Sequence, residues 1–239
     1  MNSKRAIGGV GDDVLGGAIA SRFFDGGAEK IELFIDGLED ESMSADHFFR
    51  DESQMNHAEL EALSRCRGAV LDVGAGAGCH ALVLQGHGQQ VVALEKSASL
   101  CAVLRARGVA HVVERDVMAF SEGKFDTILL LMNGFGIAGS EEGVVELLVH
   151  LKSLLAPGGK IIGDSTDIRY YREEGDLIDL AKGPMSEVEF EVRYGDETQR
   201  FRWVYPDEVL LEALAEEAGL KFETIMYCDE YHFLCQLYA

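Results

Sequence analysis

VLDVGAGAG, residues 70–78, joins a short apolar run to a helical pattern that begins at Cys79. Glycines at such a junction let the backbone turn tightly and let a ligand approach without Cβ clashes. Asp72 lies two residues before the first glycine, where a carboxylate opposes phosphate binding but suits the ammonium group of an amino-acid ligand. A tight turn between strand and helix, without any ligand, is the alternative interpretation.

The spacing of the glycines narrows the class of ligand. Gly74, Gly76 and Gly78 form GxGxG, whereas a nicotinamide or flavin fingerprint needs GxGxxG, whose third glycine would fall on Cys79. Glu95 lies 21 residues after Gly74, directly behind a second apolar run. In a doubly wound sheet an acid at this place accepts hydrogen bonds from ribose hydroxyls, each contributing about 1.5–3 kcal/mol. Together these features favour an adenosyl amino acid over a dinucleotide.

Strand-like and helix-like segments alternate through the middle of the chain. Strands are expected at Ala69–Val73, Gln90–Leu94, His111–Arg115, Asp126–Met132 and Lys160–Gly163, and helices at Cys79–Gln85, Leu100–Arg107 and Val144–Leu155. This alternation predicts parallel crossover units with helices on both faces of one sheet. The strands are nearly continuous apolar runs, as burial on both faces requires.

The flanking segments have different patterns. Residues 1–65 are expected to form an N-terminal helical cover, and residues 66–239 the main domain, with an insertion at about 164–205. The insertion predicts a hairpin of Glu187–Tyr194 and Thr198–Tyr205 around Gly195-Asp196. Residues 207–218 predict a helix, and Phe222–Cys228 and Tyr231–Tyr238 two closing strands.

Five motifs in a fixed order carry a family resemblance. They are DVGAGAG at 72–78, ALEKS at 93–97, ERDV at 114–117, FDTILLLMNGFG at 125–136 and LLAPGGKII at 154–162. In this order they resemble the class I S-adenosylmethionine (SAM)-dependent methyltransferases over about residues 68–163. The resemblance implies an α/β fold of the Rossmann-like type, with a doubly wound, mostly parallel seven-stranded sheet whose last strand is antiparallel.

The resemblance also implies SAM as cofactor and S-adenosyl-L-homocysteine (SAH) as product. The glycine loop would hold the methionine portion, Glu95 the ribose, and Asp116 with Val117 the adenine. The alternative for Asp116 is the N-cap of a short helix, and for His80 a structural role. The expected cofactor contacts are Asp72, Gly74, Ala75, Gly76, Gly78, His80, Glu95, Lys96, Asp116, Val117 and Asn133.

The acceptor side offers few candidates. Asn133 follows the fourth strand and is the candidate catalytic residue, although it could equally fix its own loop. Its segment lacks the Asn/Asp-Pro-Pro-aromatic motif of enzymes that methylate amino groups of adenine or glutamine. Asp164 and Asp167 follow the fifth strand and could be a base, a cation contact or turn-formers. Tyr170 and Tyr171 could line a pocket or pack in the core.

Composition limits the partners and the compartment. The net charge of −21 lies mostly in the flanks, with 14 acidic and 7 basic residues in 1–67 and 19 and 7 in 164–239. This disfavours nucleic acid, whose phosphates need Lys and Arg, and indicates either solubility or a cationic small-molecule acceptor. Five widely spaced cysteines without a CxxC pair predict reduced thiols, no metal site and a cytoplasmic protein. The apolar runs are too short for membrane spans of roughly 20 residues.

Three functions remain open at this point. A SAM-dependent methyltransferase with an unidentified small-molecule acceptor is favoured. A non-catalytic SAM- or SAH-binding module is compatible with the missing acceptor motif. An aminopropyltransferase is disfavoured, because Asn133 stands where that class carries paired aspartates. The oligomeric state is not indicated by these patterns.

Overall fold

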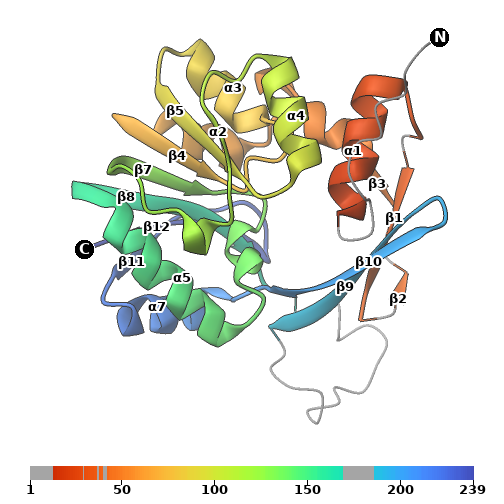
Figure 1. Cartoon of the computed structure of the whole chain (residues 1–239). Coiled ribbons are helices and arrows are strands. Elements are labelled where there is room, and N and C mark those ends of the chain that lie inside the picture. The colour runs from red at the N-terminus through yellow and green to blue at the C-terminus, as the bar shows by residue number, and fades with distance from the viewer. Residues whose placement is uncertain (1–12, 29, 37, 40–41, 169–185) are drawn as a thin grey trace.

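The computed structural model describes residues 13–28, 30–36, 38–39, 42–168 and 186–239. The main sheet contains β4 (Ala69–Val73), β5 (Gln90–Glu95), β6 (Val112–Glu114), β7 (Phe125–Leu130), β8 (Leu155–Thr166), β11 (Lys221–Tyr227) and β12 (His232–Tyr238). Their order across the sheet is β11-β12-β8-β7-β4-β5-β6 (Figure 1). β12 pairs antiparallel with both of its neighbours, β11 and β8, and the other pairings in this sheet are parallel. The predicted seven-stranded, doubly wound sheet with an antiparallel last strand is confirmed.

Helices cover both faces of this sheet, as the apolar strands require. One face carries α2 (His57–Ser64), α3 (Cys79–Gly86) and α4 (Ala98–Arg107), and the other α5 (Glu141–Leu154) and α7 (Glu208–Glu217) (Figure 1). Successive strand residues alternate between the faces: Leu71 and Ile128 pack with α5 and α7, whereas Val70 and Leu129 pack with α2 and α3. All four side chains are fully buried.

A second, smaller sheet lies beside the first. It contains β10 (Glu197–Val204), β9 (Glu187–Tyr194), β1 (Lys30–Ile35) and β2 (Leu38–Glu39), and β3 (Met43–Ser44) also pairs with β1. The predicted hairpin is present, with Gly195 at φ 61° in its two-residue turn. Besides the expected helices, the N-terminal segment therefore supplies the strand β1, which pairs with β9 of the insertion.

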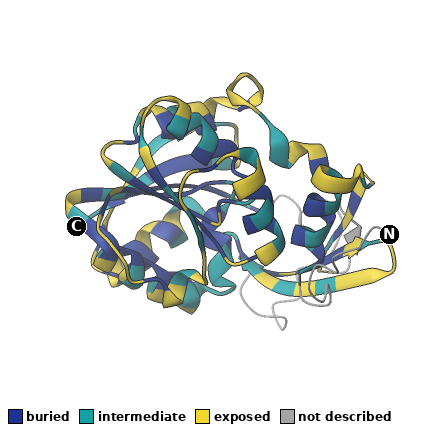
Figure 2. Cartoon of the chain, turned by 45° about the horizontal axis from the view of Figure 1, so that its top comes forward, coloured by how far each residue is buried: buried dark blue, intermediate teal, exposed yellow. Residues whose placement is uncertain are grey.

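Helix α1 (Val14–Asp25) joins the two sheets. Its Ala18 and Ile19 are buried in a cluster with Val192 of β9 and Val103 of α4. In the described part of the chain, four short 3₁₀ helices complete the fold: η2 (Ala45–Phe49), η3 (Glu52–Gln54), η4 (Val117–Ala119) and η5 (Gly134–Ala138). Figure 2 shows buried residues along the main sheet and exposed ones on the outer helix faces. Within the described residues, no helix is long and apolar enough to cross a membrane.

Two strands differ from their predicted ranges by more than one residue at an end. β7 ends at Leu130 instead of Met132, because Met132 and Asn133 have φ values of 60° and 57°. This left-handed conformation takes the chain out of the sheet. β8 begins at Leu155, directly after α5, so that Pro157 lies within the strand, where its register against β7 shifts. Proline is tolerated at such an irregularity because no regular ladder bond is lost.

Candidate functional site

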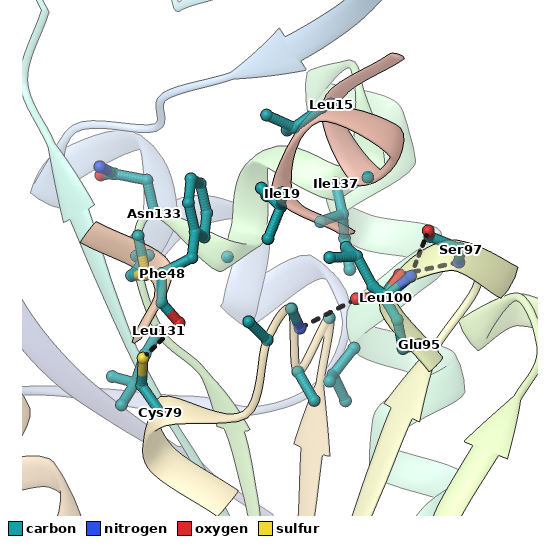
Figure 3. Close-up of a pocket in the computed structure, with 18 of the residues that line it drawn as sticks. Leu15, Ile19, Phe48, Cys79, Glu95, Ser97, Leu100, Leu131, Asn133 and Ile137 are labelled. Atoms are coloured by element: carbon teal, nitrogen blue, oxygen red, sulfur yellow. Dashed lines mark hydrogen bonds between the residues drawn. The ribbon is translucent and has the colours of Figure 1, made fainter. Parts of the chain in front are cut away.

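The strand order changes direction between β4 and β7. The chain runs from β4 outward through β5 and β6, then returns to β7 and β8. In open α/β sheets, ligands bind at such a switch point, beyond the carboxyl ends of the strands. A cavity of about 570 Å³ opens there, between these loops, α1 and the second sheet (Figure 3). Its volume lies within the ~300–1,000 Å³ typical of small-molecule sites.

The glycine loop follows β4 and lines this cavity. Gly74, Gly76 and Gly78 have φ values of 69°, 55° and 88°, a region that residues with a Cβ avoid. A Cβ on Gly78 would meet Leu104 Cδ2 of α4 at 2.7 Å, whereas at Gly74 nothing lies within 4 Å. The third glycine therefore packs the loop against α4, and the first leaves open space for a ligand.

Asp72, near the end of β4, has one carboxylate oxygen without a hydrogen-bond partner among the described residues. Its side chain lines the cavity although the residue is only 3% exposed, and burial raises its pKa. The unpartnered oxygen is Oδ2. Such a buried oxygen is costly unless a donor reaches it. An ammonium group in the cavity would supply that donor, as the sequence predicted.

Glu95 ends β5 and is joined to the glycine loop. Its Oε2 accepts the N–H of Gly76 at 3.0 Å, and its Oε1 accepts the N–H of Ser97 at 2.9 Å (Figure 3). Burial raises its pKa, an effect that the backbone N–H groups of Ser97, Gly76 and Lys96 oppose. A carboxylate has about four acceptor positions. The carboxylate of Glu95 therefore retains acceptor capacity for the hydroxyls of a ribose.

The start of α1 is fixed above Glu95. The Ser97 hydroxyl donates to Asp13 Oδ2 at 2.5 Å, and Gln199 Oε1 of β10 accepts the N–H of Val14 at 2.9 Å. Ile19, one helical turn further on, lines the cavity (Figure 3). The helix is thus held by the β5 loop on one side and by the second sheet on the other.

The outer end of the cavity holds the other predicted adenosine contacts. Asp116 and Val117 both line it, but Asp116 is exposed. Asp116 also caps η4, since its Oδ1 accepts the N–H of Met118 at 2.8 Å. The N-cap role, which the sequence left open as the alternative for Asp116, is therefore present. It does not prevent Asp116 from facing a ligand. Lys96 is exposed at the cavity rim.

Asn133 begins η5 after β7 and lines the cavity. Its Oδ1 accepts the Thr166 hydroxyl at 2.9 Å, and its backbone N–H donates to Asp164 Oδ2 at 3.1 Å. The side chain thus contributes to fixing its own loop, one of the two roles expected. Asp164 lines the cavity but Asp167 does not. Tyr170 and Tyr171, which could line a pocket or pack in the core, lie outside the described residues.

An aromatic wall, formed by Phe190, Phe201, Trp203 and Tyr205, lines the opposite side of the cavity. Phe190 and Phe201 are register partners on β9 and β10, with ring centroids 5.5 Å apart. Trp203 lies 5.9 Å from Phe201 and, two residues along the strand, shares its face. The sequence predicted the hairpin but not this role, for which the alternation of aromatic residues was the available signal.

Known proteins share the fold of this chain. A methyltransferase domain family matches residues 70–159. The crystal structure of a SAM-dependent methyltransferase from Bacteroides fragilis, in complex with SAH, is 35% identical with a TM-score of 0.85. The match covers 95% of this chain and 94% of that chain. The chain belongs to the SAM-dependent methyltransferases. The resemblance carried by its five motifs is confirmed, and SAM is its cofactor.

More distant methyltransferases share the fold. The CcbJ methyltransferase of Streptomyces caelestis is 18% identical with a TM-score of 0.61, covering 76% of this chain and 93% of that chain. A sugar N-methyltransferase from a Streptoalloteichus species is also 18% identical, with a TM-score of 0.58 and coverages of 80% and 91%. No curated protein matches the sequence.

The methyltransferase also carries a buried polar network centred on Glu59, whose members line the cavity. Glu59 Oε1 is 2.9 Å from His80 Nε2 and 2.5 Å from Arg50 Nη2, and its Oε2 accepts the Asn56 N–H at 3.0 Å. Burial raises the pKa of Glu59, but the bonds from His80 and Asn56 outweigh it and hold the pKa at about 2. The contact with Glu59 gives His80 a structural role, which was the alternative to a cofactor contact. The sequence analysis missed Glu59, whose capping box with Asn56 was a usable signal.

We expect Glu59→Gln to destabilise the protein by about 3 kcal/mol at neutral pH, because it leaves Arg50 without its buried counter-ion. The lowered pKa means that the stabilisation is complete above the unfolded value of about 4.5 and is lost as pH falls towards 2. Urea unfolding at pH 7 and pH 3.5 measures both effects. Glu61→Gln, which removes a partly exposed partner of Arg65, is the matched control and should change stability by less than about 0.5 kcal/mol. Equal losses in the two variants would contradict the network.

Proposed function

We propose that the glycine loop holds the methionine portion of SAM, with Asp72 accepting from its ammonium group. Glu95 binds the ribose hydroxyls, and Asp116 with Val117 contacts the adenine. The unpartnered Oδ2 of Asp72 and the remaining acceptor capacity of the Glu95 carboxylate support this assignment. When bound, SAM supplies an electrophilic methyl group on a sulfonium. The residues of the chain then have to align the acceptor with that methyl group and exclude water.

The acceptor, we propose, is a small organic molecule that lies against the aromatic wall. The observation that carries this proposal is that one cavity runs from Glu95 to Trp203. The wall buries the apolar body of such a molecule. The faces of Trp203 and Phe201 also attract cations, which favours the cationic type of acceptor that the acidic flanks suggested.

The N-terminal segment 1–65 and the insertion at about 164–205 act together, in this proposal, as a cover on the domain 66–239. The pairing of β1 with β9, and of the α1 start with Gln199, supports a shared function. A cover of this kind keeps water from the transferring group. The buried, unpaired thiols of Cys66, Cys101 and Cys235 suit a reducing compartment, and we propose the cytoplasm.

Calorimetry with SAM, SAH and NAD tests the cofactor site. We expect heat with SAM and SAH at micromolar affinity and none with NAD. Heat with NAD alone would contradict the assignment.

SAH release from pools of phenols, amines and thiols then tests the acceptor, and the product mass separates methyl from aminopropyl transfer. Trp203→Ala should lower SAH release at least about tenfold while SAM affinity stays within about twofold, because the proposed SAM contacts lie in the loops of the main sheet and not in the aromatic wall.

A further inference from the structure

A histidine and an aspartate form a pair in the cavity, beside Asn133 at the loop after β7. His232 Nε2 lies 2.8 Å from Asp164 Oδ2, with side chains 19% and 6% exposed, and both residues line the cavity. The pair follows from sheet register. In the antiparallel pairing of β12 with β8, His232 stands opposite Thr166, and Leu234 stands opposite Asp164. His232 and Asp164 are thus diagonal neighbours on one face, within reach of long side chains.

The loop after β7 holds this pair in place. Asp164 Oδ2 also accepts the N–H of Asn133, whose side chain accepts the hydroxyl of Thr166. Asp164 Oδ1 is buried and has no partner among the described residues. Asp164 therefore links the imidazole to the backbone of Asn133, at the carboxyl ends of the strands beside the switch point. No other histidine that lines the cavity, among the described residues, is paired with an aspartate.

We propose that His232, oriented by Asp164, is the general base of this methyltransferase, and that its acceptor carries an ionisable hydroxyl or ammonium group. This inference rests on the proposed cofactor site. With Nε2–H donating to Asp164, the neutral ring keeps its lone pair on Nδ1. The acceptor atom forms its bond to the methyl carbon as the S–CH₃ bond breaks and leaves its electron pair on sulfur. The acceptor proton passes to Nδ1, and the resulting imidazolium is stabilised by Asp164.

The charges around His232 fix the direction of the pH dependence. Three carboxylates raise the pKa of the ring: Asp164 on β8, Asp229 in the β11–β12 turn and Glu59 on α2. The hydrogen bond to Asp164 raises its pKa against the opposing effect of burial. The neighbouring Cys228 has a pKa raised by burial and stays neutral. Because a base must be neutral to accept a proton, turnover should fall as pH decreases through the raised pKa of His232.

The charge difference between SAM and SAH gives a direct test. In ¹⁵N-histidine-labelled wild-type enzyme, we expect the pKa of His232 to be lower in the SAM complex than in the SAH complex by at least about half a unit. The reason is that a sulfonium a few ångströms away disfavours the imidazolium. Equal values in the two complexes would place His232 away from the methyl group and overturn the proposal. Failure of SAM to bind at all would instead contradict the cofactor site.

Variants separate the base from a structural role. The signal that disappears from the ¹⁵N-histidine spectrum in His232→Gln identifies the resonance of His232. In the ligand-free enzyme, Asp164→Asn should lower the His232 pKa. With an acceptor found by SAH release, His232→Gln should lower kcat by about 10²–10⁴-fold with SAM affinity within about twofold. Asp164→Asn should move the pH midpoint of kcat downward. The exposed pair His87–Glu52 supplies the control, since His87→Gln should change neither kcat nor the titration. An unchanged kcat in His232→Gln would overturn the proposal.

Discussion

Replacing Glu95 with alanine should weaken SAM binding by at least about 100-fold. Two charge-assisted bonds to the ribose would be lost, each contributing about 1.5–3 kcal/mol. The N–H groups of Gly76 and Ser97 would also lose their acceptor, so that the glycine loop would no longer be fixed to β5. Calorimetric titration with SAM measures the loss, and circular dichroism checks that the variant remains folded.

Glu114→Ala is the matched control for this prediction. Glu114 stands opposite Glu95 in the parallel pairing of β6 with β5, also at a strand end, but it is exposed and faces Arg105 at 3.5 Å. Its removal should leave the SAM affinity within about twofold. Glu95→Gln should retain part of the affinity, because its amide oxygen still accepts one hydrogen bond. Wild-type binding by Glu95→Ala would show that the ribose lies elsewhere.

The main sheet could be predicted because its signals are local. Each buried parallel strand is an apolar run, and each crossover helix follows within about twenty residues. The second sheet could not be predicted in the same way. β1 is a six-residue strand whose partner β9 lies more than 150 residues later, where Phe34 stands opposite Glu191. Its alternating burial is visible in KIELFI, but so short a pattern does not identify a partner.

The difference between local signals and long-range pairings also applies to the residues of the site. The predicted contacts Asp72, Gly74 and Glu95 line the cavity because one strand–turn–helix unit and the next strand end bring them together. His232 and Asp164 are 68 residues apart, and their contact depends on the antiparallel insertion of β12 beside β8. No spacing along the chain indicates such a pair. The assignment of the cofactor contacts remains a prediction, which the Glu95 variants test.

Gly136→Ala should disable the acceptor half of the cavity while leaving the cofactor half intact. A Cβ on Gly136, in η5, would overlap the indole Nε1 of Trp203, so that the indole has to move. We expect SAH release with an identified acceptor to fall at least about tenfold and SAM affinity to stay within about twofold. Trp203 is the only tryptophan of the chain, and its fluorescence emission therefore reports the displaced wall directly.

Gly86→Ala is the control for an added methyl group. Gly86 ends α3, and a Cβ there would meet nothing within 4 Å. This variant should keep wild-type emission and turnover and gain about 0.5–1 kcal/mol of stability, since alanine loses less backbone entropy in a helix. Emission that is unchanged in Gly136→Ala would contradict the packing of Trp203 against η5. Loss of SAM binding in that variant would mean that the two halves of the cavity are not independent, because displacement of the wall would then reach the loop after β4.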